Sequence, residues 1–370
     1  MRRGNGEGSI YQEKDGRWCA VVSLPSGGRK KFHARSYQEA SDKLLAARRL
    51  VVDGIPIPDQ TQTVGEFLTS WLEDTARPSV RPGTFQSYST VVRVHLLPSL
   101  GRVRLAELTP QHVQRLLNEK SAIGLSPRRV NYIRAILRRA LNQALRWGMV
   151  GRNVATLVEP PKAQISKVHP FTPDEARVFL SAIRGDRLEA LYVVALAIGL
   201  RQGEALGLQW EDVDLDGGAI TIRQSLQRID GTLRLVEPKT DRSHRVVPIP
   251  TTGVARLMEH RERQHAERER AANLWHESGF VFTTVLGHPL DGSSVTHRFQ
   301  KLVAAAGLRR QRFHDLRHAC ASLLLAQGVS ARVVMEILGH STIALTLNTY
   351  SHVLPSTQRE ALDRMNELLC

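Results

Sequence analysis

Apolar and polar side chains alternate along much of the first 50 residues, as they do in strands that have one buried face. One such face collects Trp18, Ala20, Val22 and Leu24. Turn signals at 15–16 and 26–28 bound this run. The pattern predicts strands near 9–12, 18–24 and 30–35, followed by a helix over 37–51. We therefore expect a small three-stranded sheet with one helix in this part of the chain.

The apolar spacing becomes helical at about residue 64 and stays so to about residue 151. The 3.6-residue period is clearest along one stripe, formed by Val130, Ile133, Leu137, Leu141 and Leu145. This stretch is therefore predicted to be an all-α domain. Pro160-Pro161 separates it from the rest of the chain, because two successive prolines cannot continue a helix.

The remaining residues predict a mixture of helices and strands. Thr172-Pro173 is typical of a helix start, with a capping side chain and proline at the first helical position, and the apolar helix that comes later ends near Leu200. Strand signals follow at 219–224, 233–237 and 245–249. Helices fill the rest, and among them we expect the highly charged helix over 256–271 to be exposed and without special function.

These patterns predict a multidomain α+β fold. A sheet-and-helix domain with its linker is expected first, then a helical domain, a second linker, and a mixed, mainly α domain. Their predicted bounds are 1–60, 61–155, 156–169 and 170–370. A chain of 370 residues is long enough for each domain to bury a core of its own.

The charge balance makes nucleic acid the expected partner. The chain has 51 Lys and Arg against 36 Asp and Glu, a formal net charge of +15. Much of the excess lies between Arg77 and Arg152, where 14 cations face only 2 carboxylates. Binding through this stretch should weaken steeply with salt, because phosphate contacts release counterions. In the alternative interpretation, Arg134, Arg138 and Arg139 only solvate a helix face.

Neither a membrane span nor a disulfide framework is indicated. The longest apolar run, 190–200, has 11 residues, well short of the roughly 20 that a spanning helix needs. The polar N-terminal residues have no signal-peptide pattern. The three cysteines, Cys19, Cys320 and Cys370, are far apart and form no C-x-x-C pair, so the sequence supports no zinc ribbon. A cytoplasmic protein without a membrane partner is expected.

Four segments of the last domain offer the groups that phosphodiester cleavage needs. The reaction requires cations on the phosphate, an activated nucleophile and an acid for the leaving oxygen. The segments are Gly199-Leu200-Arg201-Gln202-Gly203-Glu204, Glu237-Pro238-Lys239-Thr240, His314-Asp315-Leu316-Arg317-His318 and Leu338-Gly339-His340. Each segment alone also has a structural interpretation. Arg201 and Glu204 would form a capping ion pair, Lys239 would be a solvated hairpin residue, and the histidines would be structural.

Tyr350 lies ten residues after His340, in a polar stretch that contains one aromatic ring. A tyrosine nucleophile must lose a phenolic proton whose usual pKa is about 10. Nearby cations and imidazoles lower the barrier for this step. On its own, the tyrosine would be interpreted as a packing residue.

Taken together, the pattern Arg…Lys…His-x-x-Arg…His…Tyr resembles the tyrosine recombinases of the phage lambda integrase family. The resemblance covers the whole chain in domain order and is most specific in the C-terminal motifs. The helical domain matches in length, helicity and charge, as a SAM-like core-binding domain would. The N-terminal sheet looks like the AP2-like arm-binding domain of integrases from phages and conjugative elements.

The resemblance implies a role for each matched position. Tyr350 would attack the phosphate and form a 3′-phosphotyrosyl link, while Arg201 and Arg317 would clamp the non-bridging oxygens. Lys239 would be the general acid, and Glu204 would be a supporting residue.

Two further positions complete the catalytic set that the family suggests. His314 and His340 would assist in proton handling and oxygen contact. Asp315 and His318 match common family residues that we expect to orient the helix. By the same resemblance, neither a metal nor a nucleotide cofactor is needed.

The family also implies partners. The working unit would be a homotetramer on paired DNA sites that proceeds through a Holliday junction, with an apolar helix over 358–369 docking onto a neighbour or, alternatively, onto its own domain. An excisionase and a host DNA-bending protein are expected, and the place of action would be the nucleoid in the bacterial cytoplasm. Contacts to arm and core attachment sites are expected from Arg29, Lys30, Lys31, Arg128, Arg134, Arg138 and Arg139.

Other interpretations fit the residues less well. His314 and His318 have the spacing of a zinc pair, but Asp315 stands where the metallohydrolase pattern has Glu. The run 212–217 imitates a calcium loop, yet its twelfth position is Arg223. Two functional alternatives stay open at this point: a type IB topoisomerase and a DNA-binding regulator without catalysis.

Overall fold

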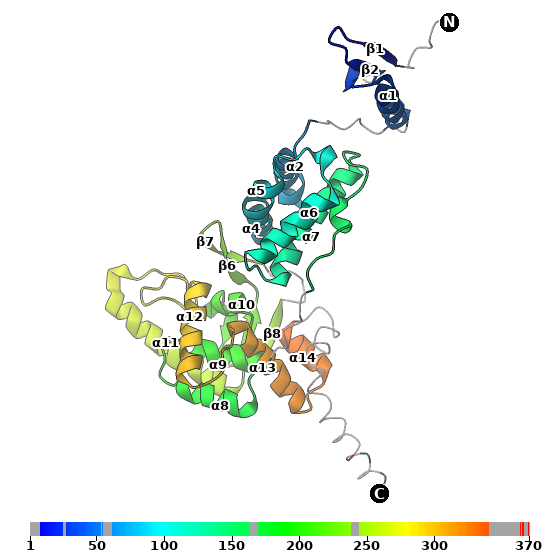
Figure 1. Ribbon diagram of the computed structural model, residues 1–370. Helices are drawn as coiled ribbons and strands as arrows, with labels where there is room; N and C mark the ends of the chain where they lie inside the picture. Colours follow the sequence, from blue (N-terminus) through cyan, green and yellow to red (C-terminus); the bar gives the residue numbers. More distant parts are fainter. Residues whose placement is uncertain are drawn as a thin grey trace. The chain divides into compact units, whose positions relative to one another are not determined.

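The computed structural model describes residues 8–24, 27–52, 54, 61–162, 169–237 and 244–339, together with 363, 365 and 369. The chain divides into two compact units, Met1–Ile165 and Ser166–Cys370 (Figure 1). The first unit contains two separate hydrophobic clusters, one in the N-terminal sheet region and one among the helices that follow. The expected mixture of a small sheet, an all-helical region and a mainly α remainder is confirmed. The predicted four-part division of the chain remains a prediction.

The N-terminal part is an antiparallel sheet covered on one face by a helix (Figure 1). Its elements are β1 (Ser9–Gln12), β2 (Trp18–Ser23), β3 (Arg29–Ala34) and α1 (Tyr37–Val52). The strand period predicted for β2 is confirmed, because Ala20 and Val22 join Phe32 and Ala34 in the core beside α1. Alternate residues of the strands therefore point to the opposite face of the sheet, which no described helix of this part covers and which is called the open face below.

The rest of the first unit is helical. The elements are α2 (Val64–Ser70), a π-helical turn (Trp71–Ala76), α3 (Arg77–Ser79), α4 (Pro82–Val91), a second π-helical turn (Val92–Leu96), α5 (Leu97–Leu100), a 3-10 turn (Leu105–Glu107), α6 (Pro110–Ala122), α7 (Pro127–Arg146) and a 3-10 turn (Val154–Thr156). The predicted stripe on α7 is buried as far as Leu141, whereas Leu145 is 41% exposed and Ala144 takes the buried position.

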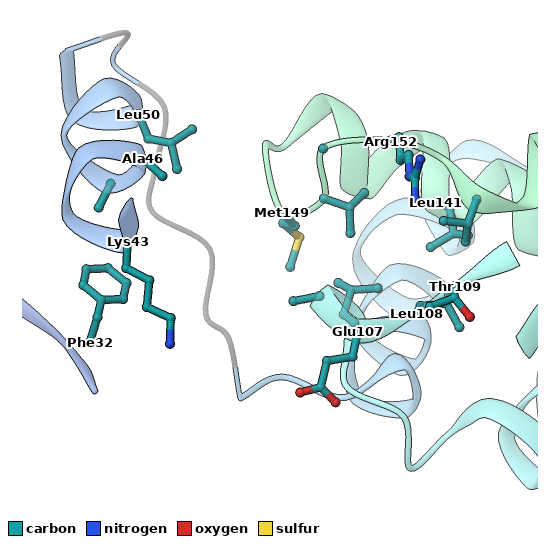
Figure 2. A pocket seen from close by; sticks show the side chains of 16 residues that line it. Phe32, Lys43, Ala46, Leu50, Glu107, Leu108, Thr109, Leu141, Met149 and Arg152 are labelled. Atoms are coloured by element: carbon teal, nitrogen blue, oxygen red, sulfur yellow. The ribbon is translucent and has the colours of Figure 1, made fainter. Parts of the chain in front are cut away.

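A cavity of about 660 Å³ lies within the first unit. Figure 2 shows Phe32 and Lys43 on one side of it and Leu108, Leu141 and Met149 on another. None of the residues that line this cavity belongs to the predicted catalytic set. The described residues of that set lie in the second unit.

The second unit combines many helices with short antiparallel strands (Figure 1). Its elements are α8 (Pro173–Ala182), α9 (Glu189–Ile198), α10 (Gln202–Leu206), a 3-10 turn (Trp210–Asp212), β4 (Val213–Asp214), β5 (Ala219–Ile222), β6 (Ser225–Ile229), β7 (Thr232–Val236), β8 (Arg245–Pro248), α11 (Thr251–Ala271), a 3-10 turn (Ala272–Leu274), α12 (Gly292–Ala305), α13 (Phe313–Ala326) and α14 (Ala331–Leu338). The helix start predicted at Thr172 is confirmed by a capping box with Glu175. The apolar helix α9 buries most of its side chains and packs against α11 and α13.

The strand pairing corrects one expectation. Lys239 was expected in a hairpin, but β7 pairs with β6, and β8 pairs with β5. The connection that contains Lys239 therefore joins two different sheets. Sequence reasoning missed β6, although Asp230-Gly231 is a hairpin signal and both residues have positive φ, at 49° and 78°.

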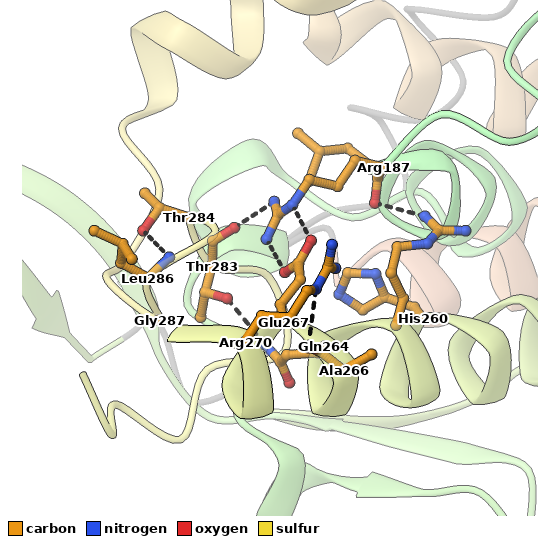
Figure 3. Close-up of polar contacts among 12 residues, drawn as sticks. Arg187, His260, Gln264, Ala266, Glu267, Arg270, Thr283, Thr284, Leu286 and Gly287 are labelled. Atoms are coloured by element: carbon orange, nitrogen blue, oxygen red, sulfur yellow. Dashed lines mark hydrogen bonds and ion pairs between the residues drawn. The ribbon is translucent and has the colours of Figure 1, made fainter. Parts of the chain in front are cut away.

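The expectation that residues 256–271 form an exposed helix was wrong for one face of α11. Leu257, His260, Gln264 and Glu267 are buried at helical spacing. Figure 3 shows the polar partners of this stripe: Arg187 donates twice to Glu267, at 2.7 and 2.6 Å, and Gln264 donates to the Thr283 hydroxyl at 3.0 Å. His260 Nε2 lies 2.8 Å from the carbonyl oxygen of Val281. Side chains with such partners can be buried at little cost.

In the described part of the chain, no helix has both the length and the apolar character that crossing a membrane requires.

Candidate active site

The C-terminal ends of α9 and α14 meet at Arg317. This side chain donates from Nη1 to the carbonyl oxygen of Gly199 at 2.8 Å and from Nη2 to that of Leu338 at 2.6 Å. Carbonyl groups at a helix C-terminus carry the negative end of the helix dipole, so both ends stabilise the guanidinium. Arg317 is only 2% exposed and lies at the base of the site.

Two glycines make this convergence possible. Gly199 and Gly339 end their helices in the left-handed conformation, with φ of 66° and 64°. A Cβ atom on Gly199 would clash with the Cδ2 atom of Leu338, and one on Gly339 would lie 3.0 Å from Nη1 of Arg245. Both positions therefore need glycine for conformation, and Gly199 needs it for space as well.

Arg201 stands at the start of α10, two residues after the end of α9. Its Nη1 donates to Oε1 of Glu204 at 2.6 Å and its backbone N–H donates to Oε2 at 3.0 Å, so the expected ion pair is confirmed. Its Nη2 lies 3.4 Å from the carbonyl oxygen of Gly339. The Arg201 side chain is 39% exposed, so this guanidinium, unlike that of Arg317, is accessible to solvent.

A third arginine, which the sequence analysis did not single out, completes the cluster. Arg245 at the start of β8 donates from Nη2 to Oε2 of Glu204 at 3.1 Å and from Nε to the carbonyl oxygen of Ile337 at 2.8 Å. Burial alone would raise the pKa of Glu204, but Arg245 and Arg201 outweigh burial and hold that pKa below its usual value. Glu204 is therefore a buried carboxylate shared by two arginines.

His314 lies on the first turn of α13. Partial desolvation, together with the neighbouring His318 and Arg317 side chains, lowers the pKa of His314 to about 4. The ring of His318 lies one turn further on, with the two ring centroids 4.9 Å apart. Both imidazoles are therefore neutral near pH 7 in the protein without DNA, since the pKa of His318 is also lowered, first by burial.

Asp315 has the orienting role that was expected of it. Its carboxylate accepts the backbone N–H of Arg312 at 2.7 Å and the Arg312 Nη2 group at 2.7 Å, which caps α13. The helix that carries His314 and Arg317 is thereby held at its first turn.

The structure brings four predicted residues, Arg201, Glu204, His314 and Arg317, into one region. The two guanidiniums donate to consecutive carbonyls, those of Leu338 and Gly339. Lys239, His340 and Tyr350 lie outside the described residues, although His340 directly follows Gly339 in sequence. Two guanidiniums therefore converge on one turn beside a histidine, with Arg201 partly exposed and Arg317 buried beneath it.

The residues predicted to contact DNA lie in the first unit. Arg29 and Lys31 point to the open face of the sheet and are exposed, whereas Lys30 pairs with Val22 and lies on the other face.

On α7, Arg128, Arg138 and Arg139 are exposed, and Arg134 is half-buried. Arg139 donates to the Tyr88 hydroxyl at 3.0 Å. Partial burial lowers the pKa of Arg134, with Arg138 adding to the effect.

Comparison with known proteins identifies two related regions. Residues 170–357 match the model of the phage integrase family, and residues 63–121 match the N-terminal SAM-like domain of phage integrases. A protein named tyrosine recombinase XerC-like, from Caldanaerobacter subterraneus subsp. tengcongensis, is 31% identical over 359 residues, which cover 92% of each chain. An integrase of Streptomyces ambofaciens is 32% identical over 369 residues, which cover 94% of this chain and 93% of the relative.

Solved structures share the fold. The Tn1549 transposon integrase in complex with a circular intermediate DNA has a TM-score of 0.70 at 22% identity, and the match covers 82% of this chain and 99% of that chain. The lambda integrase tetramer bound to a Holliday junction has a TM-score of 0.58 at 18% identity, covering 94% and 96%. The matched family model spans more than half of this sequence. The chain therefore belongs to the phage integrase family and is a tyrosine-type site-specific DNA recombinase.

Proposed function

We propose that this recombinase is the integrase of a phage or mobile element and that Tyr350 is its nucleophile. The assignment of the site rests on one observation: Arg317 donates to the carbonyl oxygen of Leu338, and Arg201 donates to that of the next residue, Gly339. Tyr350 follows this turn by eleven residues. A chain of that length can easily return to the two guanidiniums.

The proposed reaction has two reciprocal steps. The Tyr350 phenol gives its proton to a neutral imidazole, for which His314 is proposed, and its oxygen forms a bond to phosphorus. The bond from phosphorus to the 5′ oxygen breaks, and Lys239 gives a proton to that oxygen. The DNA 3′ end is then held as a phosphotyrosine. In the second step, a 5′-hydroxyl of the partner duplex gives its proton to Lys239, attacks the same phosphorus and displaces the tyrosine, which takes a proton back from the imidazole. No net hydrolysis occurs and no ATP is consumed.

The arginines stabilise the extra charge on the pentacoordinate phosphorus. The Arg201 guanidinium, at the start of α10, is partly exposed and would bind the phosphate oxygens directly. The Arg317 guanidinium is buried below it and would add its positive charge. Glu204 and Arg245 hold Arg201 in place. A neutral imidazole at His314 can donate or accept a hydrogen bond as the phosphate oxygens change their charge, and His340 is assigned a similar part.

The first unit is proposed to hold the DNA. Arg128, Arg134, Arg138 and Arg139 project from one helix, α7, and would follow the phosphate backbone at the core site. Arg29 and Lys31 share the open face of the N-terminal sheet, which would contact arm sites, and Lys30 would contact DNA from the other face of the same edge strand. Strands can lie in a DNA groove, so such a sheet face could contact the edges of the bases.

The working assembly is proposed to be a homotetramer on two paired sites of double-stranded DNA. In support, a cavity of about 710 Å³ lies between β8 and α14 in the second unit, lined in part by Val246, Pro248, Val333 and Ile337. The apolar residues of 358–369 of a neighbouring chain would fill it. An excisionase and a host DNA-bending protein are proposed as further partners, with the nucleoid in the bacterial cytoplasm as the place of action.

A suicide substrate tests the assignment of the nucleophile. The protein is incubated with a nicked core site and separated on a denaturing gel, where a covalent adduct of protein and DNA is expected. The adduct should be absent with Tyr350→Phe, while binding of the same DNA is retained. An adduct of undiminished yield with that variant would refute the assignment. Joining of two paired sites, measured beside relaxation of a supercoiled plasmid, separates an integrase from a topoisomerase.

A further inference from the structure

The open face of the N-terminal sheet carries a row of chemically reactive side chains. Cys19 of β2 pairs with Tyr11 of β1 on one side and with His33 of β3 on the other. Directly opposite residues of paired strands point to the same face. Glu13 lies two residues after Tyr11 and so projects to that face as well. Three neighbouring segments thus bring together a phenol, a thiol, an imidazole and a carboxylate.

Three of these groups are close enough to hold one ion. One ligand atom from each of Glu13, Cys19 and His33 lies within 4.8 Å of the other two. Nδ1 of His33 is 3.0 Å from Oε2 of Glu13. Cys19 is fully buried, whereas the His33 and Glu13 side chains are 49% and 26% exposed. The thiol therefore forms the floor of the group, and the other two side chains form its rim.

We propose that Glu13, Cys19 and His33 bind a divalent transition-metal ion of the zinc class on this face of the sheet. Thiolate, imidazole and carboxylate are the ligands that zinc takes in proteins, and a thiolate disfavours magnesium and calcium. Water would fill the fourth position at the solvent side. The sequence predicted no metal site; the ion proposed here would lie in the first unit, whereas the residues assigned to cleavage belong to the second.

The geometry requires only small adjustments. Tetrahedral zinc, with bonds of about 2.3 Å to sulfur and about 2.0–2.2 Å to nitrogen and oxygen, sets its ligand atoms about 3.3–3.6 Å apart. Separations of up to 4.8 Å therefore have to close by roughly 1 Å. His33 and Glu13 can supply this by side-chain rotation, since both are at the surface. The pairing of β2 with β3 fixes the backbones of Cys19 and His33.

Metal binding would change the charge of the proposed arm-contacting face. Without metal, Glu13 contributes one negative charge to the group. A divalent ion with one thiolate and one carboxylate is neutral, so the face becomes more positive by one charge. Arg29 and Lys31 project from the same face. The bound ion would therefore favour contact of this face with phosphate.

Cobalt provides a direct readout on the full-length protein. The chain is freed of metal with a chelator and titrated with Co²⁺, whose thiolate bond gives an absorption band in the near ultraviolet. Zinc is then added to displace cobalt, and its affinity is measured by competition with a coloured chelator. One ion per chain with a thiolate band is expected. Cys19→Ser should abolish the band and weaken zinc binding by on the order of tenfold or more.

Variants at the rim keep the test informative even if Cys19→Ser folds poorly. His33→Asn and Glu13→Gln alter exposed side chains, so they should leave the core of the sheet intact while each weakens zinc binding. Two control variants should bind zinc like the parent. Cys370→Ser removes a different thiol, and His276→Gln breaks an exposed pair of stacked imidazoles, His276 and His288, whose centroids are 4.6 Å apart.

Either of two results would overturn the proposal: no thiolate band in the parent protein, or zinc affinity that is the same in the parent and in all three ligand variants. The readout is independent of strand cleavage. Failure of the metal site would therefore leave the assignment of Tyr350 untouched, and the reverse also holds.

Discussion

Arg245 and Glu204 form a buried ion pair, with Nη2 of the arginine 3.1 Å from Oε2 of the carboxylate and side chains that are 7% and 5% exposed. Arg245 also holds the carbonyl oxygen of Ile337 at the end of α14. Arg245 therefore links β8, the strand that follows Lys239 in sequence, to Glu204, which holds Arg201. Arg245 and Glu204 thus form a buried polar support for Arg201 and for the end of α14.

Replacing Arg245 should destabilise the second unit. Arg245→Met leaves Glu204 buried with one guanidinium fewer, and breaking a buried pair in this way costs about 3 kcal/mol or more. Hydrogen exchange of α13 peptides in increasing urea would measure the loss. The control, Arg332→Met, breaks an exposed pair with Glu336 and should cost less than about 1 kcal/mol. Equal losses would contradict the prediction.

Gly199→Ala should reduce both stability and cleavage. Any side chain in the left-handed conformation costs roughly 1–2 kcal/mol, and here the added methyl group also clashes with Leu338, for which overpacking adds about 1–3 kcal/mol. Gly328→Ala is the matched control, because Gly328 has φ of 78° but nothing within 4 Å of the added atom. Thermal unfolding and adduct formation measure both effects. The prediction is wrong if the control loses as much stability.

The His314 imidazole should titrate near pH 4 in the protein without DNA, as measured by NMR of the ring protons. Its folded-state pKa lies below the usual 6.5, so between these pH values the unfolded chain binds more protons than the folded chain. The contribution of His314 to stability is therefore complete at pH 7 and is lost as the pH falls from about 6.5 toward 4. His314→Gln should weaken this pH dependence. A ring that titrates at 6.5 would contradict the lowered pKa.

Arg138→Gln should weaken DNA binding in a salt-dependent manner. If Arg138 contacts one phosphate, its loss should reduce the slope of log affinity against log salt by about 0.9. Arg270→Gln on α11 removes an exposed arginine of the other unit and should leave the slope unchanged. Fluorescence anisotropy with a core-site duplex at several salt concentrations measures both variants. A slope that Arg138→Gln leaves unaltered would remove this residue from the proposed interface.

Local patterns predicted the elements that depend on neighbouring residues. The three N-terminal strands, the helix α7 and the cap at Thr172 follow from side-chain period and turn chemistry, which act over a few residues. The ion pair of Arg201 with Glu204 was also predictable, because residues three apart on a helical turn are neighbours.

The polar stripe on α11 could not be predicted in this way. His260, Gln264 and Glu267 look like solvated residues in the sequence, yet they are buried because their partners come from far along the chain. Arg187, for example, lies 80 residues from Glu267. Arg245 escaped notice for the same reason, since its partner Glu204 is 41 residues away.

The left-handed turn at Gly339 has a further consequence for the proposed site. Its carbonyl oxygen and that of Leu338 already accept hydrogen bonds from the two arginines that are proposed to hold the scissile phosphate. If the assignment is right, an incoming DNA phosphate would have to compete with these two backbone carbonyl oxygens for the arginine donors. Under the proposed assignment, a phosphate that displaced these carbonyl oxygens would release the end of α14, so binding of the phosphate and release of this turn would occur together.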